Sequence, residues 1–149
     1  MRTIERDIVG GFIISADGKL LLGKNRKGGV YEGLFVVPGG GVDEDETKEQ
    51  ALLREMREET GIDISTGTVQ PINQSTGEHE KTLRDTGERV YVKMHFYDYR
   101  IDLLQDADDI VVRAEDDWDM PQWFTVNELR TIETSQPVRR TLLAAGILD

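Results

Sequence analysis

The sequence contains no cysteine, which excludes disulfide bonds and metal sites built on thiolates. It also has no apolar run of about 18 residues, so we expect no membrane-spanning helix and no contact with a membrane. The first residues, Met1–Asp7, include two acids and lack the apolar core of a secretory signal. A cytoplasmic protein is therefore the expectation.

Basic residues are scarce, since 18 Lys and Arg stand against 29 Asp and Glu, giving a net charge of −11. Such a chain is not expected to bind the backbone of a nucleic acid. The acids concentrate in two stretches: Gly40–Ile62 holds eight acids and three bases, and Asp102–Asp119 holds eight acids and one base. Acidic stretches often serve only solubility. The alternative is that both meet around a metal ion, and we favour it for Gly40–Ile62 because its spacing is so constrained.

The length of 149 residues favours one domain over residues 1–149, with mixed layers of helix and strand. Apolar and alternating segments predict strands at Ile8–Ile14, Leu20–Leu22, Leu34–Val37, within Ile62–Ile72, at Val90–Phe96 with an extension to Ile101, and at Gln122–Phe124. Polar residues with interspersed glycines predict loops at Lys24–Gly33 and Thr76–Glu88. Two short helices are expected near the C-terminus, at Val126–Leu129 and Pro137–Ala145.

A longer helix is predicted after the glycine triplet Gly39–Gly41. Thr47 can cap its start, with Gln50 three residues later, and Gly61 is a natural C-terminal stop. The acids Asp43–Glu46 favour the positive end of this helix dipole.

Three glutamates share one side of this helix. With Glu55 at zero, Glu58 lies at about −60° and Glu59 at about +40° around the axis. Leu52 and Met56 occupy the adjacent apolar arc, so we expect the carboxylates to border the buried face. Carboxylates three and four residues apart repel one another, and a hard divalent cation such as Mg²⁺ or Mn²⁺ would remove the conflict.

A plain alternative is a solvated helix linked by ion pairs such as Arg54 to Glu58. That alternative leaves unexplained both Glu46 and the segment Pro38–Gly41, where glycines let a ligand approach the main chain. The segment is not a Walker loop, because no Gly-Lys-Ser/Thr follows.

The segment Gly40–Ile62 has a fixed spacing: five residues separate Gly40 from Glu46, and seven residues separate Glu46 from Arg54–Ile62. This pattern resembles the signature of the Nudix hydrolases, with every fixed position filled. The resemblance implies an α/β/α sandwich with a mixed β-sheet. It also implies hydrolysis of a nucleoside diphosphate linked to another group, with Mg²⁺ or Mn²⁺ as cofactor.

The resemblance also implies roles for particular residues. Glu55, Glu58 and Glu59 match the metal-binding glutamates, and Glu55 is also a candidate base. The carbonyl of Gly39 matches a frequent backbone ligand. Arg54 matches the arginine that orients the glutamates, with Glu46 as its expected partner.

Members of the family commonly add an acid from a distant loop. Glu115 is favoured for this catalytic role because of its position in the chain ahead of Trp123. Other acids stay open as alternatives: Asp116, Asp117, Glu78, Glu80 and Glu88.

Substrate contacts are less constrained by the sequence. Three basic residues precede the glycines Gly40 and Gly41 and can reach phosphates, namely Lys24, Arg26 and Lys27. The alternative is that they are ordinary loop charges. Trp118 lies in a polar run, so we expect an exposed ring able to stack on a base. Trp123 is expected in the core, and His95 is expected to have a structural or surface role. Tyr31 remains a candidate for stacking on a base.

The substrate class stays open between a nucleoside triphosphate, including oxidised or noncanonical ones, and a nucleotide sugar or ADP-ribose. A nucleotide-sensing module without turnover is the alternative outside enzymes, and no exposed apolar run favours a protein–protein scaffold. A homodimer is compatible with the sequence, although nothing in it specifies the dimer surface.

Overall fold

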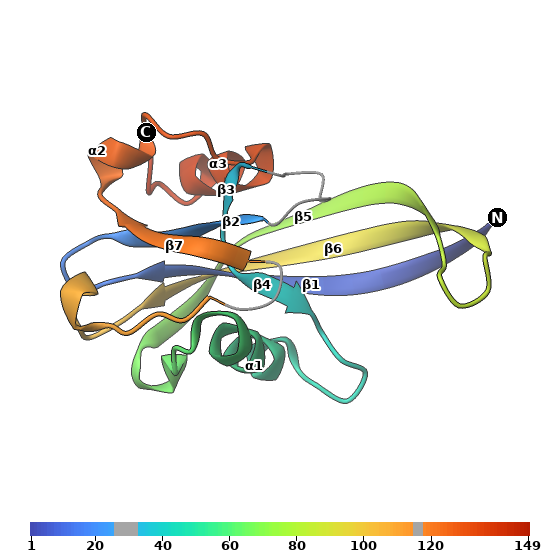
Figure 1. Ribbon diagram of the computed structural model, residues 1–149, viewed down its shortest axis with the longest axis horizontal. Coiled ribbons are helices and arrows are strands. Elements are labelled where there is room, and N and C mark those ends of the chain that lie inside the picture. Colours follow the sequence, from blue (N-terminus) through green and yellow to red (C-terminus); the bar gives the residue numbers. More distant parts are fainter. Residues whose placement is uncertain (26–32, 115–117) are drawn as a thin grey trace.

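The computed structural model describes residues 1–25, 33–114 and 118–149 (Figure 1). Its centre is a seven-stranded sheet with the order β3-β2-β1-β6-β5, in which β4 also pairs with β1 and β7 with β2. β1 and β6 run parallel and the other pairs are antiparallel, so the sheet is mixed, as expected. The strands are β1 (Arg2–Ile14), β2 (Leu20–Asn25), β3 (Phe35–Val36), β4 (Gly39–Gly41), β5 (Thr68–Thr82), β6 (Arg89–Asp102) and β7 (Trp118–Phe124).

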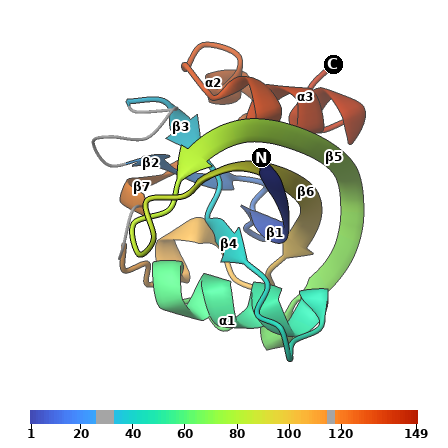
Figure 2. The same ribbon diagram turned by 90° about the vertical axis from the view of Figure 1, so that its right-hand side faces the viewer.

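Helices cover both faces of this sheet (Figure 2). They are α1 (Lys48–Thr60), α2 (Val126–Leu129) and α3 (Gln136–Ala144), with short 3-10 turns at Ile64–Thr66 and Ala107–Asp109. Leu52 and Met56 of α1 pack in one core cluster, whereas Leu129 of α2 and Leu142 of α3 pack in another. This is the three-layered sandwich that the sequence predicted. No helix among the described residues is long and apolar enough to cross a membrane.

β1 begins six residues earlier than the apolar run at Ile8 indicated. It pairs with β6 in continuous register from Arg2↔Val90 to Ile14↔Asp102, so backbone pairing holds its polar first half in the sheet. With β5 and β6, this half forms an arm that projects from the body of the molecule (Figure 1).

The predicted loop at Thr76–Glu88 is wrong for most of its length. β5 runs to Thr82 and pairs with β6 almost residue by residue, leaving only a short turn at 83–88. Most of β5 is exposed to solvent. A strand that contributes little to the core needs no alternation of apolar residues, so its sequence looks like that of a loop.

The glycine triplet also belongs to the sheet. As β4 it pairs antiparallel with β1, with Gly39 opposite Gly10 and Gly41 opposite Ile8. A Cβ at residue 39 would stand 2.2 Å from the backbone oxygen of Val9, so only glycine permits this close pairing.

α1 begins and ends as predicted. Thr47 accepts a hydrogen bond from the Gln50 amide (3.1 Å), and the Gln50 side chain accepts one from the Thr47 amide (2.9 Å), which completes a capping box. Gly61 ends the helix in the left-handed region, at φ 74°. The carboxylates of α1 are thereby fixed in register beside β4.

Candidate active site

The three glutamates of α1 lie at the border of its buried face, as predicted. Glu59 is 7% exposed, the side chain of Glu55 is 13% exposed and that of Glu58 is 51% exposed. Two carboxylates are therefore held within the protein, and the third stands at the surface.

β4 lies directly against the two buried carboxylates. The amide of Gly39 donates a hydrogen bond to Oε1 of Glu59 at 2.8 Å. A Cβ at residue 40 would stand 2.4 to 2.5 Å from the carboxyl atoms of Glu55, so glycine leaves the space that this carboxylate fills. The pairing of β4 with β1 keeps the triplet in this place.

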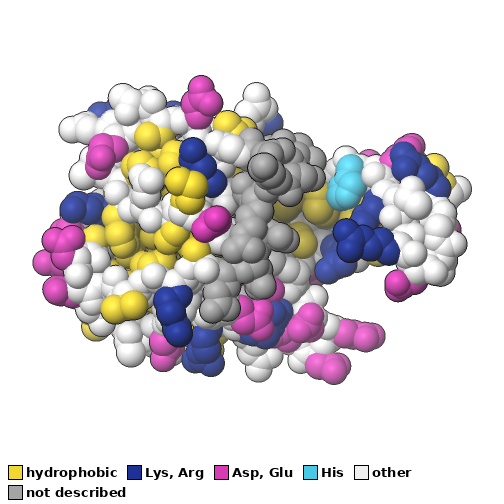
Figure 3. Space-filling view, in the orientation of Figure 1, with side chains coloured by type: hydrophobic (Ala, Val, Ile, Leu, Met, Phe, Trp, Pro, Cys, Tyr) yellow, Lys and Arg dark blue, Asp and Glu magenta, His cyan; other side chains and the backbone are white. Residues whose placement is uncertain are grey.

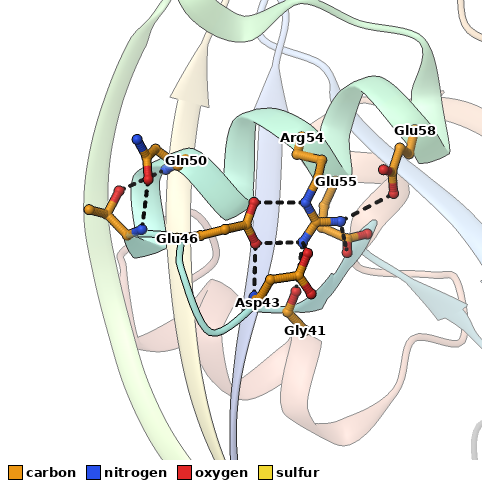
Figure 4. A network of polar contacts seen from close by, with 8 residues as sticks. Gly41, Asp43, Glu46, Gln50, Arg54, Glu55 and Glu58 are labelled. Atoms are coloured by element: carbon orange, nitrogen blue, oxygen red, sulfur yellow. Dashed lines mark hydrogen bonds and ion pairs between the residues drawn. The ribbon is translucent and has the colours of Figure 1, made fainter.

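Arg54 joins the glycine strand, the segment before α1 and the helix itself (Figure 4). Its Nε and Nη2 donate to the two carboxylate oxygens of Glu46 at 2.8 and 2.7 Å, a bidentate pair. Nη2 also donates to the carbonyl oxygen of Gly41 at 2.9 Å. Nη1 donates to Glu55 at 2.9 Å and to Glu58 at 3.2 Å. The expected pairing of Arg54 with Glu46 is thus present.

This pairing dominates the local electrostatics. Hydrogen bonds from Arg54 and from the Asp43 amide lower the pKa of Glu46 to about 2. The same contact with Glu46, followed by that with Glu55, raises the pKa of Arg54. Both groups are therefore fully charged at neutral pH.

The donor set suits a divalent cation in kind, because Glu55, Glu58, Glu59 and backbone carbonyls are hard oxygen ligands. In the described part of the chain, however, no three Asp, Glu or His side chains converge closely enough to surround an ion. The guanidinium of Arg54 donates hydrogen bonds to Glu55 and Glu58, and the backbone amide of Gly39 donates one to Glu59.

The family model of the NUDIX domain matches residues 5–145. The chain belongs to the Nudix family of hydrolases. It is 32% identical over 138 residues to the nucleoside triphosphatase NudI of Enterobacter sp. (strain 638), covering 91% of this chain and 94% of that protein. A shorter match, 46% identical over 55 residues, covers 37% of this chain and 41% of the CTP pyrophosphohydrolase of Escherichia coli (strain K12).

Solved Nudix structures share the fold of this chain. The dihydroneopterin triphosphate pyrophosphohydrolase of E. coli has a TM-score of 0.68 at 18% identity and covers 91% of both chains. The Nudix domain of Shewanella oneidensis NrtR, solved with ADP ribose, has a TM-score of 0.68 at 17% identity, covering 97% of this chain and 88% of that one.

The expectation of an exposed Trp118 is wrong. Its side chain is 2% exposed, its indole N–H donates to the carbonyl oxygen of Val36 at 3.1 Å, and its ring fills the space beside Gly23. Because polar residues surround Trp118 in the sequence, its place in strand β7 was not predicted. Trp123, expected in the core, lies partly buried at the edge of the same core cluster.

The structure describes some of the other predicted residues and not the rest. Lys24 extends over the ring of Phe35, with Nζ 5.0 Å from the ring centroid. His95 lies on β6 with its Nε2 3.3 Å from Oε1 of Glu5, in keeping with a surface role. Several candidates lie outside the described residues, namely Arg26, Lys27, Tyr31, Glu115, Asp116 and Asp117.

Two of the alternative acids have partners away from α1. Glu80 pairs with Arg89 at 2.9 Å and Glu88 with Arg2 at 2.8 Å, both on the projecting arm. In the second acidic stretch, Asp102 pairs with Arg100 at 2.9 Å.

Asp98 was not among the site residues predicted from the sequence. Asp98 of β6 lines a pocket of about 290 Å³ with mostly apolar walls, to which Gly39 and Gly40 also contribute. The signal was available, since Asp98 continues the alternating series Val90 to Phe96 and so places a carboxylate on an otherwise apolar face of the strand.

Proposed function

We propose that this Nudix hydrolase cleaves a nucleoside triphosphate into a nucleoside monophosphate and pyrophosphate, with Mg²⁺ or Mn²⁺ as cofactor. The observation that carries the proposal is the contact of β4 with the two buried carboxylates Glu55 and Glu59. The choice of substrate is supported by similarity over nearly the whole chain to a protein named a nucleoside triphosphatase.

In this proposal, Glu55, Glu58 and Glu59 hold the cation, together with the carbonyl of Gly39. The bound cation neutralises phosphate charge and lowers the pKa of water. We place the phosphates along the backbone of Gly40 and Gly41, whereas the space that a Cβ of Gly40 would occupy is filled by Glu55. Arg54, fixed by Glu46, orients Glu55 and Glu58 without touching substrate.

The chemical step is attack of water on phosphorus. As the new P–O bond forms and the bridging P–O bond breaks, a carboxylate accepts the proton of the water and pyrophosphate leaves. Glu55 is our candidate for this base, with Glu115 as the alternative from outside the motif.

The test is a panel of ordinary and oxidised nucleoside triphosphates, nucleotide sugars and ADP-ribose, assayed with Mg²⁺, with Mn²⁺ and with chelator. Products are identified by chromatography. We expect metal-dependent release of pyrophosphate from a triphosphate. Turnover that is indifferent to chelator would refute the metal site.

Glu59→Gln keeps the shape of the side chain and an oxygen acceptor for Gly39 but loses the charge. Because changes to residues that only support a metal ligand cost about 10- to 100-fold, we expect a loss of at least about 100-fold in kcat. Glu49→Gln, in the exposed first turn of the same helix, is the matched control.

The runner-up substrates are nucleotide sugars and ADP-ribose. An ADP-ribose pyrophosphatase of Methanocaldococcus jannaschii is 50% identical, but only over 50 residues that cover 34% of this chain. Cleavage of ADP-ribose alone in the panel would favour this class. Nucleotide-induced thermal stabilisation without any product would instead favour a sensing module.

A further inference from the structure

The pocket beside β4 lies on the side of the sheet away from α1. Its walls come from β1, β6, the segment before β4 and the start of α3, with Phe12, Val37, Phe96 and Val138 among the apolar residues that line it. Its volume of about 290 Å³ is close to the lower limit of about 300 Å³ for small-molecule sites. It can therefore hold one part of a nucleotide.

This pocket and the carboxylates of α1 lie on either side of β4. Gly39 and Gly40 line it, and the same two residues contact Glu59 and Glu55. A nucleotide whose phosphates lie over β4 would thus have this apolar pocket next to it. Flat apolar walls such as Phe96 favour an aromatic ring over a sugar.

Asp98 is the acid among these apolar walls. Within the described part of the chain, its one hydrogen bond comes from the Thr141 hydroxyl, which donates to Oδ2 at 2.7 Å, and no Lys or Arg pairs with it. Burial raises the pKa of this carboxyl above its usual range. An acid kept in an apolar pocket without a cation is unfavourable for folding, and such groups gather at functional sites.

The direction of its hydrogen bonds is fixed by a chain of donors. Asn73 Nδ2 donates to the Thr141 hydroxyl oxygen at 3.1 Å, so that hydroxyl points its hydrogen at Asp98. Oδ1 lies toward Gly10, where a Cβ would stand 2.9 Å from it. An ionised carboxylate only accepts hydrogen bonds, so a ligand that satisfies it must bring N–H or O–H donors.

We propose that this pocket takes the nucleobase and that Asp98 selects bases with an exocyclic amino group, which donates to its carboxylate. A base with a carbonyl oxygen at the same position would place two acceptors against each other. The inference rests on the proposed function, because it takes the ligand of the site to be a nucleotide.

The experiment measures kcat/KM for two matched pairs of triphosphates, CTP with UTP and GTP with ITP, in the parent protein and in Asp98→Asn. The members of each pair differ at an amino group. We expect the amino-bearing member of at least one pair to be preferred about 10-fold or more, because a site built around a hydrogen bond rejects analogues that lack it. Asp98→Asn, which both donates and accepts, should lower that preference about 10-fold.

Asp102→Asn is the control, since it removes a carboxylate from the same strand at a place where Arg100 pairs with it. It should leave the ratios unchanged. A parent that discriminates in neither pair, or an Asp98→Asn ratio equal to that of the parent, would overturn the inference while metal-dependent turnover upheld the proposed function. If Asp98→Asn does not fold, the ratios of the parent still decide.

Failure of the proposed function would look different, because no triphosphate would be cleaved by any variant. In that case, binding of CMP against UMP and of GMP against IMP to the parent tests the pocket directly. Equal affinities within both pairs would then refute base selection by Asp98.

Discussion

At the scale of single residues, Arg54 has contacts that no other cation can reproduce. Its planar guanidinium contacts Glu46, Gly41, Glu55 and Glu58 at once, whereas a lysine ammonium is a point charge without this fork.

We expect Arg54→Lys to reduce kcat by about 10- to 100-fold, because the supports of the glutamates are lost. KM should change much less, since Arg54 does not touch substrate in our proposal. Arg57→Lys, an exposed arginine of the same helix, is the control for the general effect of the exchange. A rise in KM with kcat unchanged would instead place Arg54 in substrate binding.

The lowered pKa of Glu46 predicts a particular dependence of stability on pH. Its carboxyl titrates near 4.5 when unperturbed and at about 2 in the folded protein. The folded state therefore gains stability from this ionised group above about pH 4.5, and loses it as the pH falls toward 2.

Glu46→Gln should be less stable than the parent at neutral pH, with a difference that shrinks as the pH falls from about 4.5 to 2. Thermal unfolding of both proteins across this range gives the comparison. A difference that stays constant down to pH 2 would mean that the ion pair with Arg54 does not contribute in this way.

Residues of the Gly40–Ile62 pattern were predictable because the period of a helix determines which side chains share a face. Asp98 and Trp118 were not predicted, for opposite reasons. Asp98 was overlooked although its place in the alternating series of β6 gave a signal, whereas Trp118 is a buried ring within an acidic run, where the pairing of β7 with β2 overrides the local composition.

At the scale of elements, α1 and α2 offer a matched pair of capping boxes, headed by Thr47 and Thr125. The hydroxyl of each threonine accepts a hydrogen bond from the backbone amide three residues later. Only the box of α1 lies next to a proposed site residue, Glu46.

We expect Thr47→Ala and Thr125→Ala each to cost about 1 kcal/mol of stability, which lowers Tm by about 2–4 °C at this chain length. Only Thr47→Ala should also reduce kcat/KM well below both melting temperatures, because fraying at the start of α1 moves Glu46 away from Arg54. Equal activity in the two variants would show that the site tolerates a loose first turn.

Elements with a buried apolar face were predictable, as the second half of β1, the α1 helix and the body of β6 show. The start of β5 falls within the strand predicted in Ile62–Ile72, but β4 and the rest of β5 were not predicted, because neither owes its place to apolar side chains. β4 depends on the absence of side chains at Gly39–Gly41, and β5 depends on backbone pairing to β6.

At the scale of the whole molecule, binding of a cation should couple to unfolding. A ligand at about 100 times its Kd stabilises the folded state by about 2.7 kcal/mol, so Tm should rise by about 5–10 °C with saturating Mg²⁺. Differential scanning fluorimetry with and without chelator measures this rise.

The same titration on Glu59→Gln should give a much smaller rise, while Glu49→Gln should behave like the parent. Since the chain has a net charge of −11, part of any effect of Mg²⁺ is general screening. Identical rises in all three proteins would mean that screening is the whole effect and that α1 holds no cation.

The outer edge of β5 has a consequence for how copies of the molecule meet. Among the described strands β5 pairs only with β6, so its other edge presents free backbone groups on which a second sheet could grow. Pro71 lacks a backbone donor, a bulge follows it, and the charges of Glu78, Glu80 and Lys81 flank the rest. The projecting end is accordingly dominated by charged and polar side chains (Figure 3). The polarity that makes β5 resemble a loop thus also protects the arm against edge-to-edge aggregation.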